Sequence, residues 1–251
     1  MKYCFTTLSI GEEYENKTIQ FYTDLASRTT NCDFFITTTN KDFPDLGERF
    51  KIKVINPPSI HHESIITTTS FHYNLKSLAL KNVVEFEKNN PESEKYEYII
   101  FSDGDWTMFE NFSEEKVFNM LNWTRDNEYD FVFERPARIG DSRAHPDGSF
   151  FKQKLIDYDM LEYDKWDEAH CANEQFMIFK NSYKFRFFVQ RWEQFLWYSI
   201  ENKIRNYAEG FEIGISALEA GMKWHFQNAF GHFLQNCFEF ESKNGQKYIR
   251  F

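Results

Sequence analysis

The sequence contains few of the residues that mark fibrous, disulfide-rich or low-complexity proteins. Its 251 residues include only 10 glycines, 6 prolines and 4 cysteines. Collagen-like chains and Pro/Gly-rich disordered chains need much more glycine and proline, so both classes are excluded. The four cysteines are scattered and form no C-x-x-C pair, which argues against a zinc knuckle or a redox motif. We interpret most of them as free thiols buried in the core.

Long apolar runs are also missing. No stretch of about 18 apolar residues occurs, so we expect no helix that spans a membrane. The apolar part of residues 1–8 is too short, and gives way to polar residues too soon, for a secretory signal peptide. These two absences favour a cytoplasmic protein.

Basic residues are fewer than acidic ones. The chain has 29 Lys and Arg against 39 Asp and Glu, a formal net charge of −10. This balance argues against a general nucleic-acid-binding surface, which would be basic, whereas an acidic protein attracts divalent cations. Hydrophobic residues make up 41% of the chain, which excludes global disorder. The length suits one domain with a sizeable core.

Strands and helices are predicted to alternate over about the first 105 residues. Apolar and β-branched runs predict the strands, and apolar residues at helical spacing predict the helices between them. The predicted strands cover 2–10, 32–37, 50–55 and 98–101, and the predicted helices cover 12–28 and 71–89. This order predicts an α/β fold with a mostly parallel central sheet flanked by helices.

The second half of the chain continues this alternation less regularly. A helix is predicted to start at Ser113, because a capping serine is followed by two acids in the first turn. We also expect strands at 130–133, 174–180 and 223–227, helices at 185–207 and 211–220, a polar loop at 135–149 and an irregular tail at 231–251. The aromatic stripe of the 185–207 helix is interpreted as core. No Pro/Gly/Ser-rich linker interrupts the chain, so we expect a single domain over residues 1–251.

The most informative segment joins the predicted strand 98–101 to two carboxylates. Asp103 and Asp105 follow that buried strand, and in an extended chain side chains two residues apart point to the same side. In open α/β sheets, ligands bind at the border formed by the carboxyl ends of the strands, here called the carboxyl rim. Carboxylate oxygens suit Mg²⁺ or Mn²⁺, and such an ion completes its shell with water and substrate phosphates. Gly104, between the two acids, is expected to let the backbone approach a ligand closely.

Together these segments resemble the GT-A glycosyltransferases, which use nucleotide-sugar donors and a DxD motif. Asp103-Gly104-Asp105 resembles that motif, which implies that Asp103 lies near the ribose or the metal and that Asp105 binds the metal. The end of the first strand, with Thr6 and Thr7, resembles the site that holds the nucleotide base. The resemblance implies a metal-dependent transfer of a sugar, from a UDP-sugar above all, to an acceptor hydroxyl.

Further segments match the same family in order along the chain. Asn74 and Lys76 lie on a helix that resembles the one reaching back to the donor. Glu209 and Glu212 resemble the acidic motif that starts a late helix and supplies the base in inverting members; the choice between them stays open. His232 resembles a C-terminal third metal ligand, and His225 competes for that role.

The resemblance implies a GT-A-like single domain, with a donor-binding half at about 1–110 and an acceptor-binding half at about 111–251. The acceptor is expected to be a glycan, a protein or a hydroxymethylated base of viral DNA.

The predicted loop 135–149 gathers three arginines, Arg135, Arg138 and Arg143. A guanidinium group binds two phosphate oxygens at once, which makes Arg138 a candidate for contact with the donor phosphates. A solvated loop is the competing interpretation. The same basic stretch, extended by Lys152 and Lys154, favours a phosphate-rich acceptor such as DNA, whereas the acidic net charge argues against one.

Two other functions compete with a glycosyltransferase. A nucleotidyltransferase would also use a metal and a nucleotide, but it would normally carry a basic, Gly-rich loop after the first strand. Residues 6–13 contain one glycine and no basic residue, which argues against that function. A non-enzymatic domain with a structural cation at Asp103 and Asp105 is the third alternative.

Overall fold

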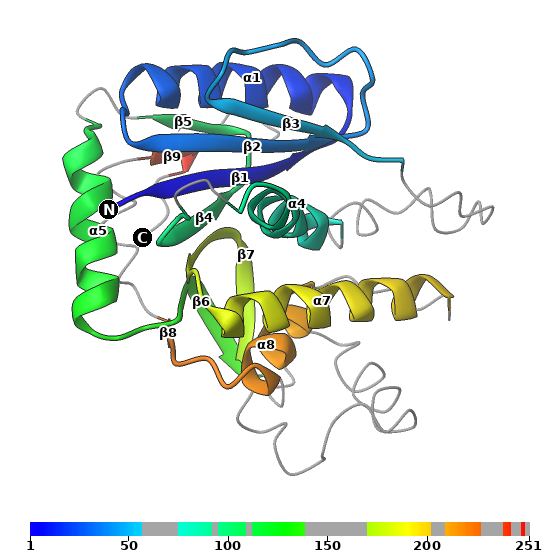
Figure 1. The fold of residues 1–251 in the computed structure, drawn as a ribbon, viewed down its shortest axis with the longest axis vertical. Coiled ribbons are helices and arrows are strands. Elements are labelled where there is room, and N and C mark those ends of the chain that lie inside the picture. Colours follow the sequence, from blue (N-terminus) through cyan, green and yellow to red (C-terminus); the bar gives the residue numbers. More distant parts are fainter. Residues whose placement is uncertain are drawn as a thin grey trace.

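We analysed a computed structural model of the chain, which describes residues 1–56, 75–91, 95–108, 112–138, 170–201, 209–226, 238–241 and 247–248. Within these ranges the protein has an α/β fold built on a seven-stranded sheet with the strand order β3-β2-β1-β4-β7-β6-β8 (Figure 1). The strands are β1 (Tyr3–Ser9), β2 (Cys32–Thr38), β3 (Phe50–Val54), β4 (Tyr98–Ser102), β6 (Phe131–Arg138), β7 (His170–Lys180) and β8 (Trp224–Phe226).

The sheet is mostly parallel, as the alternation of strands and helices predicted. Strands β3, β2, β1 and β4 pair in parallel, and so do β6 and β8. The exception is β7, which is antiparallel to both of its neighbours, β4 and β6. The central strands β1 and β4 are continuously buried, as expected for parallel strands covered on both faces.

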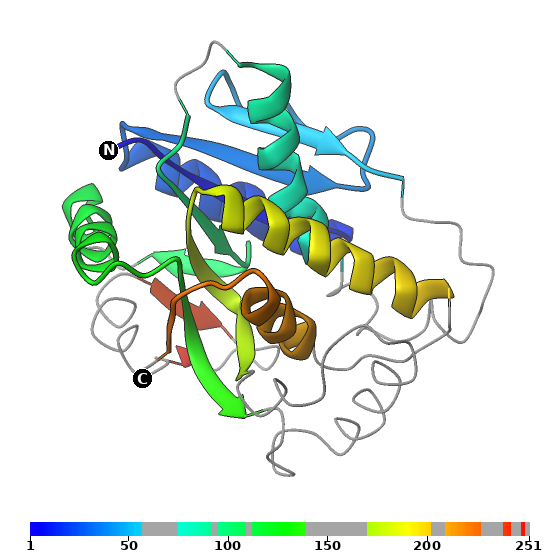
Figure 2. The ribbon, with the colours of Figure 1, turned by 60° about the horizontal axis from the view of Figure 1, so that its bottom comes forward.

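Helices cover both faces of this sheet, so the described part of the chain forms three layers (Figures 1 and 2). The five helices are α1 (Glu12–Ser27), α4 (Lys76–Asn89), α5 (Glu114–Asp126), α7 (Tyr183–Glu201) and α8 (Glu209–Glu219). Apolar side chains of α1 and α5 share one core cluster with the sheet, whereas those of α4, α7 and α8 share the cluster on the other face. The aromatic stripe of α7 belongs to that second core, as predicted.

A second, three-stranded sheet has the order β10-β9-β5 and corrects the prediction of an irregular tail. Its strands are β5 (Trp106–Met108), β9 (Phe238–Glu241) and β10 (Lys247–Tyr248). Strand β5 starts one residue after Asp105, and its register pairs Trp106 with Phe240 of β9. The carboxyl-terminal segment therefore returns to the Asp103–Asp105 turn. Strands of two to four residues are too short to show a period in the sequence, and their pairing partners lie far along the chain. Such strands therefore could not be predicted from the sequence.

The predicted loop 135–149 is also corrected at its start. Strand β6 continues to Arg138, and β7 already begins at His170, because the two strands pair beyond the end of β4. The register between them shifts on either side of Glu134, and Pro136, which cannot donate a ladder hydrogen bond, lies within this irregularity. Residues 139–149 lie outside the described part of the chain.

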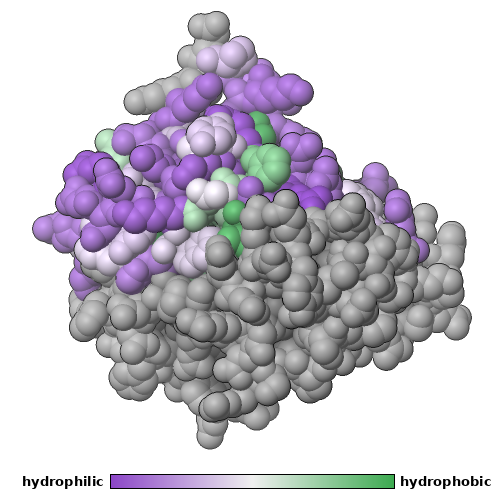
Figure 3. All heavy atoms as spheres, turned by 90° about the horizontal axis from the view of Figure 1, so that it is seen from below, coloured by the Kyte–Doolittle hydropathy of each residue, from purple (hydrophilic) through white to green (hydrophobic). Residues whose placement is uncertain are grey.

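Where they fall on described residues, the other predicted boundaries differ from those observed by a few residues. Helix α8 begins at Glu209, two residues before the predicted start, and Gly221 follows it with φ 60°, as expected for a glycine that ends a helix. None of the described helices is long and apolar enough to cross a membrane. The face shown in Figure 3 is mostly hydrophilic where residues are described, with only small hydrophobic islands.

Candidate functional site

The carboxyl end of β4 lies where the topology of the sheet changes direction. From β1 the chain proceeds outward through β2 and β3, and β4 then pairs with the other side of β1. Crevices at such switch points, outside the carboxyl ends of the strands, are where open α/β sheets bind ligands. Asp103 and Asp105 stand directly after β4 at this place. The segment is a turn in the structure and not the extended chain that the sequence pattern predicts.

Asp103 is buried and forms an ion pair with Lys76, the first residue of α4. The Lys76 Nζ lies 3.0 Å from Asp103 Oδ1, and the two side chains are only 5% and 11% exposed. The ammonium also lies 5.6 Å from the centre of the Phe101 ring. The family resemblance implies a place in the donor site for both charged residues. The structure brings them together as an ion pair, a contact that could not be predicted from the sequence.

Position 104 has no room for a side chain because helix α1 packs against it; the close approach to a ligand stays a prediction. A Cβ atom at this position would lie 2.1 Å from Oγ1 of Thr18 and 2.9 Å from its Cβ. The Gly104 N–H donates a 2.9 Å hydrogen bond to the Tyr14 hydroxyl oxygen, which also comes from α1. Helix α1 therefore holds the turn between the two acids in place.

The Tyr14 hydroxyl lies close to both carboxylates. Burial raises its pKa well above the ordinary value of 10.0, and the negative charges of Asp103 and Asp105 raise the pKa further. The hydrogen bond from Gly104 acts in the opposite direction but does not reverse the shift. Tyr14 therefore stays protonated near neutral pH, and its hydroxyl remains a hydrogen-bond donor. The sequence pattern predicts Tyr14 only as part of the apolar face of α1. Nothing in the neighbouring residues predicts a role for its hydroxyl.

The turn from β1 into α1 is acidic. Gly11 precedes the helix with φ 92°, and the first turn carries Glu12, Glu13 and Glu15. Glu15 is buried and accepts hydrogen bonds from Thr38 Oγ1 at 3.1 Å and from Asn40 Nδ2 at 2.8 Å. Negative charges at a helix N-terminus occupy the position that an anion would take. Phosphate binding at this helix end is thus disfavoured.

Thr6 and Thr7 do not face the rim. Both are fully buried within β1. The Thr6 hydroxyl donates to the Ala79 carbonyl oxygen at 2.9 Å, and the Thr7 side chain is hydrogen bonded to the Tyr22 hydroxyl. These contacts tie β1 to α4 and α1, so this geometry lends no support to contacts between the two threonines and a nucleotide base.

The start of α8 lies at the same rim as Asp103. The end of α8 leads through Lys223, whose carbonyl oxygen accepts a hydrogen bond from the Asp130 N–H at the beginning of β6, into β8. Strand β8 runs parallel to β6, so α8 must run from the carboxyl rim back to the opposite edge. Glu209 is its first residue and thus stands at the rim. Glu212 is 0% exposed, on a helix packed between β7 and α7.

Of the remaining predicted ligands, His225 is described by the structure and does not lie at the rim. His225 pairs with Val132 of β6, which places it level with Ile100 and, at about 4.8 Å per strand, roughly 14 Å from β4. Its ring packs against Trp123 and Tyr129. His225 is therefore no ligand for an ion at Asp105. His232 and Asn74 lie outside the described residues.

Arg138 ends β6, opposite His170 of β7, where the two strands extend past β4. Its backbone therefore lies beyond the carboxyl rim of the sheet, on the side of β4 away from β1.

A divalent ion at this rim would find an incomplete protein shell. Among the described residues, no three His, Cys, Asp or Glu side chains form a group that could hold a metal. Asp103 and Asp105 supply hard oxygen donors, which suits Mg²⁺ or Mn²⁺ retaining water and ligand oxygens. The nearby Lys76 ammonium opposes a cation there. The donor set therefore fits an ion that is shared with an anionic ligand better than it fits one held by protein alone.

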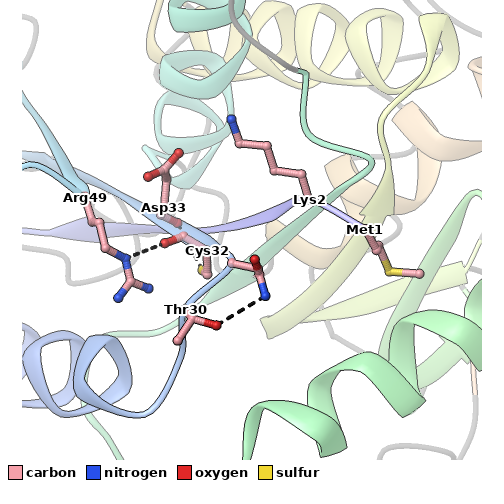
Figure 4. Close-up of a pocket in the computed structure, with 7 residues that line it drawn as sticks. Met1, Lys2, Thr30, Cys32, Asp33 and Arg49 are labelled. Carbon is pink, nitrogen blue, oxygen red and sulfur yellow. Dashed lines mark hydrogen bonds between the residues drawn. The ribbon is translucent and has the colours of Figure 1, made fainter.

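A pocket of about 390 Å³ lies at the opposite ends of the strands, where β1 and β2 begin (Figure 4). Its charged groups are already engaged. Arg49 Nε donates to the Cys32 carbonyl oxygen at 2.9 Å, and Asp33 accepts a 2.6 Å hydrogen bond from the Tyr96 hydroxyl. These bonds hold the edge of the sheet together, so we assign the candidate site to the carboxyl rim.

No protein-family model matches this sequence, and comparison with curated proteins finds no significant relative.

Proposed function

We propose that the protein is a metal-dependent glycosyltransferase, which transfers a sugar from a nucleotide-sugar donor to an acceptor hydroxyl. The observation that carries the proposal is the position of Asp103 and Asp105, directly after β4 at the switch point of a mostly parallel sheet. The mostly parallel sheet, covered by helices on both faces, is compatible with the GT-A-like layout that the sequence resembles.

Asp105, with Asp103, would hold Mn²⁺ or Mg²⁺, and that ion would neutralise the charge that develops on the departing nucleoside diphosphate. Lys76 supplies a second positive charge at the same rim, 3.0 Å from Asp103. The Tyr14 hydroxyl donates a hydrogen bond to a phosphate or water oxygen. In this way the chain's own groups bind the donor, orient it and balance its charge.

The base that accepts the proton of the acceptor hydroxyl is proposed to be Glu209. A general base must reach that hydroxyl directly or through one water molecule. Glu209 begins α8 at the rim, whereas Glu212 is fully enclosed by its neighbours. Of the two acids between which the sequence leaves the choice open, Glu209 is the one whose backbone begins α8 at the rim, so it is the preferred candidate.

The acceptor is proposed to be a glycan or a protein in preference to DNA. A duplex is bound by many Lys and Arg contacts to phosphate, whereas this chain has a net charge of −10. Arg138, at the end of β6, is retained as a candidate contact for the donor phosphates or for a phosphate-rich acceptor.

Mass spectrometry of donor hydrolysis tests the proposal. The protein is incubated with a panel of UDP-, GDP-, CMP- and TDP-sugars, each with Mn²⁺, with Mg²⁺ or with EDTA. Slow release of a nucleotide from one donor, only when the metal is present, is the expected result and identifies both the base and the sugar. Release of pyrophosphate from a nucleoside triphosphate, without hydrolysis of any sugar donor, would instead indicate a nucleotidyltransferase.

A further inference from the structure

The ammonium group of Lys76 and a bound metal ion compete for the same carboxylate. Lys76 Nζ lies 3.0 Å from Asp103 Oδ1 in a pair that is almost entirely buried. At such short range and low solvent exposure, charges interact strongly and are only weakly screened by salt. A divalent cation that approached Asp103 would therefore be attracted by the carboxylate and repelled by the ammonium beside it.

An anionic ligand would remove this conflict. Lys76 is the first residue of α4, and the first turn of this helix carries no acidic residue, unlike the first turn of α1. The residue before it, Leu75, offers no side-chain hydrogen bond to the helix N-terminus. A phosphate group placed beside Lys76 would meet an ammonium and the positive end of a helix dipole together. It would also bring negative charge and oxygen ligands to the metal.

We propose that Lys76 makes metal binding depend on the nucleotide. Without a diphosphate, Lys76 holds Asp103 and keeps the affinity for a divalent cation low. When a nucleoside diphosphate binds, its phosphate oxygens share the Lys76 charge, and Asp103 becomes available to the metal. Metal and nucleotide then bind cooperatively, and by linkage each raises the affinity for the other by the same factor. This inference rests on the proposed function, because the diphosphate is the leaving group of the donor.

Calorimetric titration of Mn²⁺ into three proteins tests the coupling, with and without saturating UDP. The proteins are the wild type, Lys76→Met, which removes the charge at similar length, and Lys76→Arg, which keeps it. For the wild type we expect UDP to tighten Mn²⁺ binding at least tenfold. For Lys76→Met we expect Mn²⁺ alone to bind at least tenfold more tightly than to the wild type, with little further effect of UDP. Lys76→Arg should keep the weak binding of Mn²⁺ alone.

Lys81→Met is the matched control. Lys81 also lies on α4, and its ammonium pairs with Glu193 of α7 and with Glu85, not with Asp103. This variant should bind Mn²⁺ and UDP as the wild type does. If Lys81→Met raised the affinity for Mn²⁺ as much as Lys76→Met, the effect would come from total charge, and the proposal would be wrong.

If Lys76→Met is less stable than the wild type, thermal unfolding provides a second test of the proposal. Removing one partner leaves Asp103 as a buried charge, which is strongly destabilising. Mn²⁺ alone should then replace the missing ammonium and raise the Tm of Lys76→Met more than it raises the Tm of the wild type. An equal or smaller shift would overturn the proposal, as would the absence of Mn²⁺ binding to both proteins.

The experiment separates this inference from the proposed function. Tight Mn²⁺ binding by Lys76→Met, without any UDP effect on the wild type, would show the charge competition but count against a diphosphate leaving group. Cooperative binding of UDP and Mn²⁺ that is unchanged in Lys76→Met would keep the proposed function and refute the role of Lys76.

Discussion

Thr18 of α1 occupies the space into which a side chain at position 104 would project. The Thr18 Oγ1 would lie 2.1 Å from a Cβ atom at Gly104, well inside any real contact distance. The same hydroxyl is hydrogen bonded to Ser9 Oγ at 3.1 Å, at the end of β1. The turn that carries the two acids is therefore packed against α1 and β1, and its shape depends on the absence of a side chain between them.

Gly104→Ala should destabilise the protein by about 1–3 kcal/mol, as other over-packed cores are destabilised. Thr18→Ala removes the Oγ1 and Cγ2 contacts but leaves the Cβ, so the double variant should regain only part of this loss. A double-mutant cycle by urea unfolding measures the coupling. Strictly additive effects of the two substitutions would contradict the packing described for this turn.

Tyr14→Phe should weaken Mn²⁺ binding and lower stability. The substitution leaves the buried Gly104 N–H without its acceptor, which costs about 1–3 kcal/mol. It also removes the hydroxyl that lies near Asp103 and Asp105. Calorimetry with Mn²⁺ and UDP gives the binding change.

Tyr96→Phe is the matched control for Tyr14, because it removes a hydroxyl that donates to Asp33 at the opposite edge of the sheet. It should lose stability without losing affinity for Mn²⁺. Equal affinities of Tyr14→Phe and Tyr96→Phe for Mn²⁺ would exclude Tyr14 from the site.

The sequence predicted the strand that carries the site better than the contacts between the side chains of the site. The buried strand before Asp103 could be predicted because four consecutive apolar residues are typical of a central parallel strand. The strand order, and with it the position of this strand at the switch point, is seen only in the structure. Lys76, which the family resemblance assigns to the donor site, begins α4 and pairs with Asp103; its contact with a donor stays a prediction.

The features that could not be predicted from the sequence depend on contacts between residues that lie far apart in the chain. Tyr14 and Thr18 look like ordinary members of a helix, and their contacts with Gly104 arise only when α1 packs on the sheet. The pairing of β5 with β9 joins residues more than 100 positions apart. The assignment of Thr6 and Thr7 to the nucleotide-base site comes from the family resemblance alone. In the structure their side chains form hydrogen bonds within the core.

Glu209→Gln should lower sugar transfer at least about 100-fold, since loss of a general base typically costs that factor or more. Glu212→Gln should leave turnover nearly unchanged, because the Glu212 side chain is 0% exposed. Steady-state kinetics with the donor and acceptor identified by mass spectrometry measure both variants. A large loss for Glu212→Gln, with wild-type rates for Glu209→Gln, would reverse the assignment.

His225→Phe should make the protein less sensitive to mild acid. Burial lowers the pKa of His225 below its ordinary value of 6.5. The unfolded chain then takes up a proton at higher pH than the folded protein does, so this contribution to stability is complete above pH 6.5 and falls as the pH drops below it. Phenylalanine keeps the ring contacts with Trp123 and Tyr129 but cannot titrate.

Urea unfolding at pH 7.5 and at pH 5.5 checks this prediction. The loss of unfolding free energy between the two values should be smaller for His225→Phe than for the wild type. The same pH dependence in both proteins would show that His225 is protonated equally well in the folded state.

The central claim is that Asp105 and Asp103 bind a metal ion together with a nucleoside diphosphate. Thermal unfolding with UDP, with Mn²⁺ and with both tests it most directly, in the wild type and in Asp105→Asn, which keeps the size of the side chain but removes its charge. The account predicts that UDP raises the Tm of the wild type only when Mn²⁺ is present, and that Asp105→Asn loses this joint stabilisation. An equal joint stabilisation of Asp105→Asn, or stabilisation of the wild type by UDP without metal, would contradict it.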